Sequence, residues 1–173
     1  MILPKIRDKR FITVRRGGRL VDEDHHLLAI WAAQCAEHVL HYFEEICPDD
    51  DRPRLAIKAT YAWVNGEIKM MQAREAAGAS QDAAREVKAM SEAARLAALS
   101  AGQAAVVAHV AAHELGAAAY AIRAVMAASP INEKEMNRSI ECQWQRERLQ
   151  ERIRALVIDD QRLRNDICWF VFD

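Results

Sequence analysis

Between residues 67 and 128 the chain contains almost nothing that would end a helix. A straight helix of this length would extend about 90 Å at 1.5 Å per residue. A folded chain of 173 residues has a radius of gyration of about 16 Å, so this stretch must fold back on itself. We expect its breaks at Gly78-Ala79-Ser80 and at Ser100-Ala101-Gly102, because glycine and serine interrupt or cap helices.

The composition favours helices throughout. The chain has 32 alanines among 173 residues and only 6% aromatic residues. Alanine is the best helix former, whereas strands are rich in β-branched and aromatic side chains. Residues 104–128 are the richest in small side chains, which let neighbouring helices approach closely. We therefore expect a central helix there, ended by Ser129-Pro130.

The remaining helices follow from apolar residues spaced three and four apart. We expect a long helix from Asp22 or Asp24 to Ile46, and a second with Pro53 in its first turn that ends near Asn65-Gly66. A mixed-charge helix covers residues 133–156, and Asp159-Asp160 caps a short last one. The apolar tail, residues 167–172, is expected to pack on the core. The predicted fold is all-α: a single-domain bundle of about six helices over residues 22–173, with residues 1–21 as a short extended arm packed on it.

Charge, cysteines and hydropathy exclude several classes of protein. The formal net charge is −1, which argues against a surface that attracts nucleic acid as a whole. The four cysteines lack the paired spacing of a zinc site, and a chain of this length needs no disulfides, so free thiols in the cytoplasm are expected. The start of the chain lacks the apolar stretch of a signal peptide, and His109, His113, Glu114 and Arg123 make residues 104–128 too polar for a membrane span.

No motif requires a catalytic mechanism. The nearest candidate is His109 with His113, four residues apart and therefore expected on one helical face. Glu114 follows the second histidine, so the H-E-x-x-H order of zinc proteases is absent, and spacing supplies no third ligand. We expect no catalytic residue, metal or cofactor; the alternative is a small metal-dependent hydrolase that uses His109 and His113.

The polar edge of the first helix and the connection that follows it form the best candidate surface. Charges of both signs lie on this connection, and loops held by rigid helices often carry binding residues. The alternative interpretation is a capped turn with solvated flanks. The predicted partner-binding residues are His38, His41, Glu44, Glu45, Asp49, Asp50, Asp51, Arg52 and Arg54.

Characteristic residue strings are spread along almost the whole chain. They are Lys5-Ile6-Arg7-Asp8, Arg15-Arg16-Gly17-Gly18, Asp24-His25, Trp31-Ala32-Ala33, Cys35-Ala36-Glu37-His38-Val39-Leu40, Pro48-Asp49-Asp50-Asp51-Arg52-Pro53-Arg54, Ala62-Trp63-Val64-Asn65-Gly66-Glu67-Ile68, Ala108-His109-Val110-Ala111-Ala112-His113, Gln145-Arg146-Glu147-Arg148-Leu149, Ile153-Arg154-Ala155-Leu156-Val157 and Leu163-Arg164-Asn165-Asp166-Ile167-Cys168-Trp169. With these strings the chain resembles the immunity proteins of bacterial polymorphic toxin systems, in particular the immunity-protein-5-like family. It departs from that family at Gln103 and near Gln81-Asp82, where the family often has a histidine.

The resemblance implies an all-α cytoplasmic protein that binds and neutralises a cognate toxin without catalysis. The expected partner is thus a toxin protein, with no nucleic acid and no membrane. The sequence leaves the oligomeric state open, a homodimer included. A further alternative is a phage-type inhibitor or adaptor of a nucleic-acid defence system, although a near-neutral chain lacks the strongly acidic face of a nucleic-acid mimic.

Overall fold

A computed structural model describes residues 3–173 and shows an all-α protein, which confirms the predicted fold class. Seven helices have thirteen or more residues, and one is a single turn. Their bounds are α1 Asp22–Val39, α2 His41–Glu44, α3 Arg52–Val64, α4 Met70–Glu86, α5 Glu92–Val106, α6 Glu114–Ala128, α7 Lys134–Glu147 and α8 Glu151–Arg164. Short 3₁₀ turns lie at Lys9–Phe11, Val14–Arg16, Val87–Ala89 and Ala111–His113.

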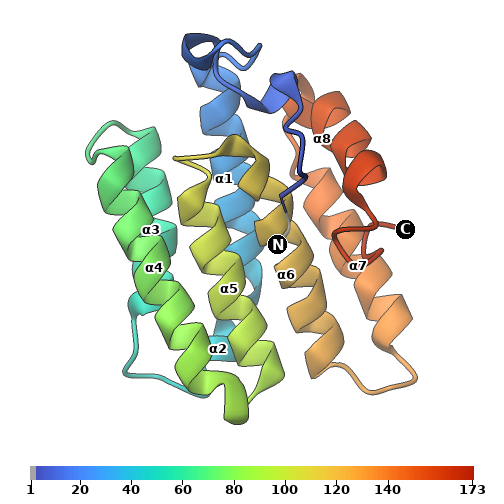
Figure 1. Cartoon of the computed structure of the whole chain (residues 1–173). Helices are drawn as coiled ribbons and strands as arrows, with labels where there is room; N and C mark the ends of the chain where they lie inside the picture. Colours follow the sequence, from blue (N-terminus) through green and yellow to red (C-terminus); the bar gives the residue numbers. More distant parts are fainter. Residues whose placement is uncertain (1–2) are drawn as a thin grey trace.

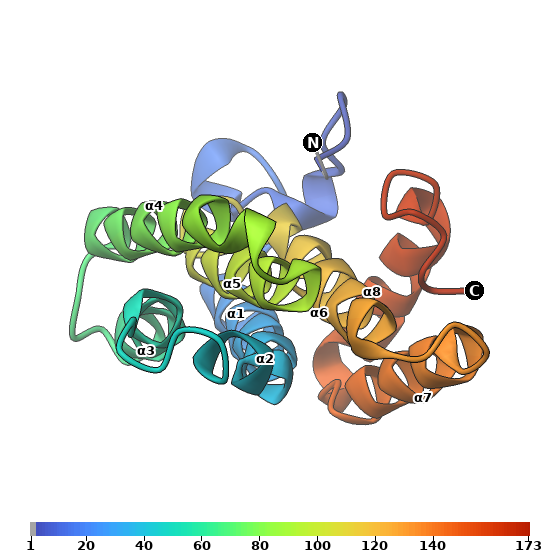
Figure 2. The same cartoon turned by 90° about the horizontal axis from the view of Figure 1, so that it is seen from below.

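The helices are arranged around α5 and α6. Figure 1 shows α3, α4, α5, α6 and α7 running up and down the molecule, with α1 behind α5. Seen from below in Figure 2, α4, α5 and α6 lie in one row, α3 and α1 pack against one face of it, and α7 and α8 continue beyond α6. Helix α5 contacts α1, α3, α4 and α6, so the alanine-rich part of the chain forms the centre of the bundle.

Both predicted breaks in the alanine-rich stretch are wrong, because the residues concerned lie inside helices at close contacts between them. Gly102 faces α4: a Cβ at this position would lie 3.2 Å from the carbonyl oxygen of Ala77. Ser80 donates a hydrogen bond of 2.8 Å to the carbonyl of Ala98, and Ser100 one of 2.7 Å to that of Ala117. Small residues here bring three helices together instead of ending them.

The chain actually turns at two places that contain no proline or glycine. The first follows Val87–Ala89, and Ser91 caps α5 by accepting a hydrogen bond of 3.2 Å from the Ala94 amide. The second lies between Val106 and Glu114, so residues 104–128 do not form one helix. No helix of the described residues has the length and apolar character needed to cross a bilayer.

Other boundaries agree in part with the prediction. Helix α3 begins at Arg52 and ends at Val64, followed by the cap Asn65 and by Gly66 at a φ of 74°, as expected. The first helix ends at Val39, and the single turn α2 follows separately. The predicted mixed-charge helix divides into α7 and α8, so Asp159 and Asp160 lie inside α8 and cap nothing.

The N-terminal arm turns sharply before α1 begins. Gly17 has a φ of 80°, and a Cβ on Gly18 would lie 1.9 Å from the carbonyl oxygen of Ile12. The turn lets Phe11 and Leu20 bury their side chains in the core. At the other end of the chain, Cys168, Val171 and Phe172 are buried as predicted for the tail, while Trp169 and Phe170 stay exposed.

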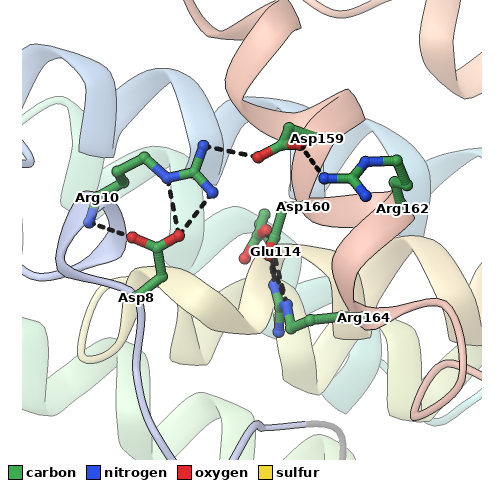
Figure 3. Close-up of polar contacts among 7 residues, drawn as sticks. All are labelled: Asp8, Arg10, Glu114, Asp159, Asp160, Arg162 and Arg164. Atoms are coloured by element: carbon green, nitrogen blue, oxygen red, sulfur yellow. Dashed lines mark hydrogen bonds and ion pairs between the residues drawn. The ribbon is translucent and has the colours of Figure 1, made fainter.

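Ion pairs hold α8 against α6 and against the arm. Figure 3 shows the Arg164 guanidinium next to the carboxylates of Asp160 and Glu114; it donates hydrogen bonds of 2.9 Å to Asp160 Oδ1 and to Glu114 Oε1. All three residues are buried, and burial raises the pKa of Glu114 well above its usual value. Nearby, Arg10 of the arm pairs with Asp159 of α8 at 2.8 Å.

Candidate partner-binding site

A groove lies where the end of α1 and α2 face α7 and the end of α6. Its volume is about 410 Å³. His38 and His41 form one wall, and Ile140 and Glu141 of α7 contribute to the other. Two of the predicted partner-binding residues therefore line a single hollow, about as large as many ligand pockets.

A buried carboxyl group organises the floor of this groove. Glu141 is 3% exposed, and its Oε2 lies 2.9 Å from Nδ1 of His38. Its Oε1 accepts a hydrogen bond of 2.9 Å from the side-chain amide of Gln145, and the main-chain carbonyl oxygen of Gln145 accepts one of 2.8 Å from the Trp31 indole. The floor of the groove is thus connected to the core through three hydrogen bonds, which restrain the positions of its side chains.

Burial shifts the pKa values of both groups toward their uncharged forms. Burial raises the pKa of Glu141 to about 7 and lowers the pKa of His38. The positive charge of Arg148 lowers the pKa of His38 further. At neutral pH the contact is therefore a hydrogen bond of an uncharged imidazole, which can accept from the carboxylic acid or donate to the carboxylate.

Aromatic stacking fixes the plane of the His38 ring. The ring lies flat on Trp144, with centroids 3.6 Å apart and planes 5° from parallel. The guanidinium of Arg148 lies over Trp144 at 3.5 Å from the ring centroid. A second, shallower hollow of about 220 Å³ opens beside this stack, so His38 separates two depressions.

The rim of the groove is apolar and solvent-exposed. Ile140 is 60% exposed, and Met136 on the preceding turn of α7 and Ile131 in the α6–α7 connection are exposed as well. Large aliphatic side chains left in water next to a concave polar floor are typical of protein interfaces.

The predicted α2–α3 connection carries charges that are largely paired within the chain. Arg52 donates to Asp50 at 2.7 Å and to Glu86 of α4 at 2.6 Å. Arg54 holds Glu44 through two hydrogen bonds of 2.6 and 2.8 Å. These pairs fasten the connection onto α2 and α4, whereas Glu45, Asp49 and Asp51 are exposed.

Sequence reasoning found His38 and missed the residues that surround it. Glu141, Trp144 and Arg148 come from α7 and the residue after it, and His38 and Glu141 are 103 positions apart. One signal was available: Glu141 lies on the same helical stripe as Cys142 and Gln145, which are buried. A carboxyl group on a buried stripe indicates a specific polar contact.

His109 and His113 do not share a helical face, so that prediction is wrong. Both lie in the connection between α5 and α6. His113 Nδ1 lies 2.7 Å from Oε1 of Gln103, the position where the resembled family often has a histidine. Within residues 3–173, no three side chains of His, Cys, Asp or Glu gather as metal ligands would.

Comparison with known proteins identifies the family. The comparisons with curated proteins and with solved structures find no match to the chain. The model of one protein family, described as Imm-5 like putative immunity protein, matches residues 18–152 of the 173. The matched range includes α1 to α7, and with them the groove of His38 and Glu141. The chain therefore belongs to the Imm-5 like family of immunity proteins.

Proposed function

We propose that this protein binds one cognate toxin in the cytoplasm and neutralises it by stoichiometric contact, without catalysis. An immunity role implies a toxin partner in general, and family membership supplies that role. Inhibition of this kind requires a rigid, desolvated contact patch with charged groups around it, and it requires no reacting group.

The observation that carries the proposal is the groove between α1 and α7. It combines a fixed polar floor, made by His38 and Glu141, with the exposed apolar side chain of Ile140 at its edge. Binding energy at interfaces concentrates in a few side chains, surrounded by contacts that exclude water. A toxin side chain inserted into the groove would find both hydrogen-bonding groups and apolar contact.

We propose that the α2–α3 connection belongs to the same contact face and supplies its charged residues. Glu45, Asp49 and Asp51 are exposed next to the paired charges of Asp50, Arg52 and Arg54. Exposed charges at a rim act mainly on the rate of association and on its dependence on salt. We therefore expect a toxin surface with complementary basic groups opposite these carboxylates.

The test measures binding of the purified chain to the toxin encoded beside its gene. Ile140→Asp introduces a charge at the edge of the groove and should raise the dissociation constant by about 30-fold or more, the effect of losing an interface anchor. Leu163→Asp is the matched control, because Leu163 is similarly exposed but lies on α8, away from the groove. Equal affinities of the two variants would contradict this contact face, and absence of a one-to-one complex would contradict the proposed function.

A further inference from the structure

Another hollow, of about 500 Å³, lies at the opposite end of α1 from the groove. The arm forms one side of it, and the end of α3, the start of α4 and the α5–α6 connection form the rest. These segments meet at the upper end of the molecule in Figure 1. We call this hollow the arm pocket. Its volume falls within the range of small-molecule binding sites.

The arm pocket is lined by cationic side chains and by no carboxylate. Arg7, Arg15 and Arg16 face it. Arg15 is paired with Asp22 at 2.9 Å, but Arg7 and Arg16 have no ion pair among the described residues. The chain as a whole has a net charge of −1, so this local excess of positive charge is not a property of the overall composition.

Two histidines add polar groups to the inner wall. His25 is 5% exposed and fixed by a contact of 2.7 Å between its Nε2 and the carbonyl oxygen of Val107. The Nδ1 atom of His109 is buried and has no hydrogen-bond partner in the described chain. Burial lowers the pKa of His109, and the positive charges of Arg74, Arg16 and Arg7 lower it further.

An apolar surface faces these cations. Trp63 at the end of α3 and Met70 at the start of α4 both line the arm pocket. The rings of His25 and His26 each contact Trp63 edge-on, with centroids 4.9 Å apart, so the position of the indole is fixed. A rigid aromatic ring near unpaired arginines offers contact to a planar group that carries a negative charge.

We infer that the arm pocket binds a small phosphorylated ligand with a planar ring, of the nucleotide class. Its phosphate lies among Arg7, Arg16 and His109, and its ring lies toward Trp63 and Met70. Guanidinium groups bind phosphate through charge-assisted and often bidentate hydrogen bonds. Because the arm supplies part of the wall, the ligand also fastens the arm to the bundle.

The test is calorimetric titration of the full chain with AMP, inorganic phosphate and adenosine at constant ionic strength. We expect saturable binding of AMP, weaker binding of phosphate and no binding of adenosine. Arg16→Gln and Arg7→Gln should each raise the dissociation constant for AMP about tenfold or more. Arg19→Gln is the matched control, because it removes the same charge from an exposed position of the arm outside the pocket.

Several results would overturn the inference. They are the absence of saturable AMP binding, equal affinities for AMP and adenosine, binding of phosphate with exclusion of AMP, and equal effects of Arg16→Gln and Arg19→Gln. Far-ultraviolet circular dichroism of each variant shows whether the bundle has kept its helices. The titration uses no toxin, so its failure is distinct from a failure of the proposed inhibitory contact.

Discussion

Two pairs of arginines lie at opposite ends of the bundle: Arg52 and Arg54 at one end, Arg7 and Arg16 at the other. Of these four, only Arg52 and Arg54 bind carboxylates in the described part of the chain. Arg52 and Arg54 hold Asp50, Glu86 and Glu44 and so join the α2–α3 connection to its neighbours. Arg7 and Arg16 face a hollow whose lining includes no acid. The same type of side chain therefore joins segments of the chain at one end and is available to a ligand at the other.

The two ends also differ in how burial acts on their titratable groups. At the arm end, burial lowers the pKa of His113 to about 4. At the groove, it raises the pKa of Glu141 to about 7. Burial favours the uncharged form in both cases, but loss of that form requires acid for the histidine and base for the carboxyl group. The contributions of the two groups to stability therefore have opposite dependences on pH.

The largest predicted effect separates these two contributions. The pKa of His113 is lower in the folded chain, so its contribution falls by about 3 kcal/mol as the pH drops from 6.5 to 4. The pKa of Glu141 is higher in the folded chain, so its contribution falls by about 3 kcal/mol as the pH rises from 4.5 to 7. Relative to the native chain, the free energy of unfolding should increase more with pH in Glu141→Gln and less in His113→Gln, as measured by urea denaturation between pH 4 and 8.

The control for this experiment is Glu45→Gln, which neutralises a carboxylate at an exposed position near the same groove. Its denaturation curves should follow those of the native chain across the pH range. If Glu141→Gln also follows the native chain, burial of Glu141 does not control the acid–base behaviour of the groove, and the contrast between the two ends is lost.

The second prediction concerns the arm turn. Gly18→Ala places a Cβ 1.9 Å from the Ile12 carbonyl, so the turn that carries Arg15 and Arg16 must rearrange. We expect a loss of about 2 kcal/mol in the free energy of unfolding, as for other steric overlaps in packed regions, together with weaker AMP binding. Toxin binding through the groove should not change, since the groove lies at the other end of α1.

Gly78→Ala provides the comparison for that substitution. Gly78 lies within α4, and a Cβ there meets no atom within 4 Å. Alanine should therefore stabilise the chain by about 0.5–1 kcal/mol through helix propensity alone. Equal changes in melting temperature for Gly18→Ala and Gly78→Ala would show that the arm turn is not constrained as the structure indicates.

The smallest predicted effect compares the two kinds of arginine directly. Arg52→Ala breaks its contacts with Asp50 and Glu86 and should lower the free energy of unfolding by about 1 kcal/mol, which moves the melting temperature by a few degrees. Arg16→Ala breaks no ion pair of the described chain and should change stability by less than about 0.5 kcal/mol. Calorimetric melting of both variants decides this; a larger loss for Arg16→Ala would reverse the assignment of roles.

Helix-forming stretches could be predicted from the sequence, but the places where the chain reverses could not. Glycine and serine break an isolated helix, yet Gly102 and Ser100 serve close packing between helices, which depends on neighbours distant in sequence. The turn before Ser91 has a local signal, the serine cap, that a search for glycine overlooks. The turn after Val106 has no comparable signal.

The candidate site shows the same limit. The polar edge of α1 places His38 at the surface, because Leu28, Trp31 and Cys35 occupy the buried face. Nothing local identifies Glu141 as its partner, since that contact exists only once α7 packs beside α1. The charges of the α2–α3 connection were recognised as a group, but their pairing with Glu86 depends on where α4 ends.

Arg164 lies beyond residue 152, the last residue that the family model matches, yet its guanidinium binds Glu114 inside the matched range. A chain shortened to the matched residues would lose nearly all of α8, and with it the cation that Glu114 binds. Removing one member of a buried ion pair costs about 3–5 kcal/mol where the other member stays buried. The last residue that the family model matches is therefore not a suitable place to shorten this protein. A shorter version for expression should retain α8 through Arg164.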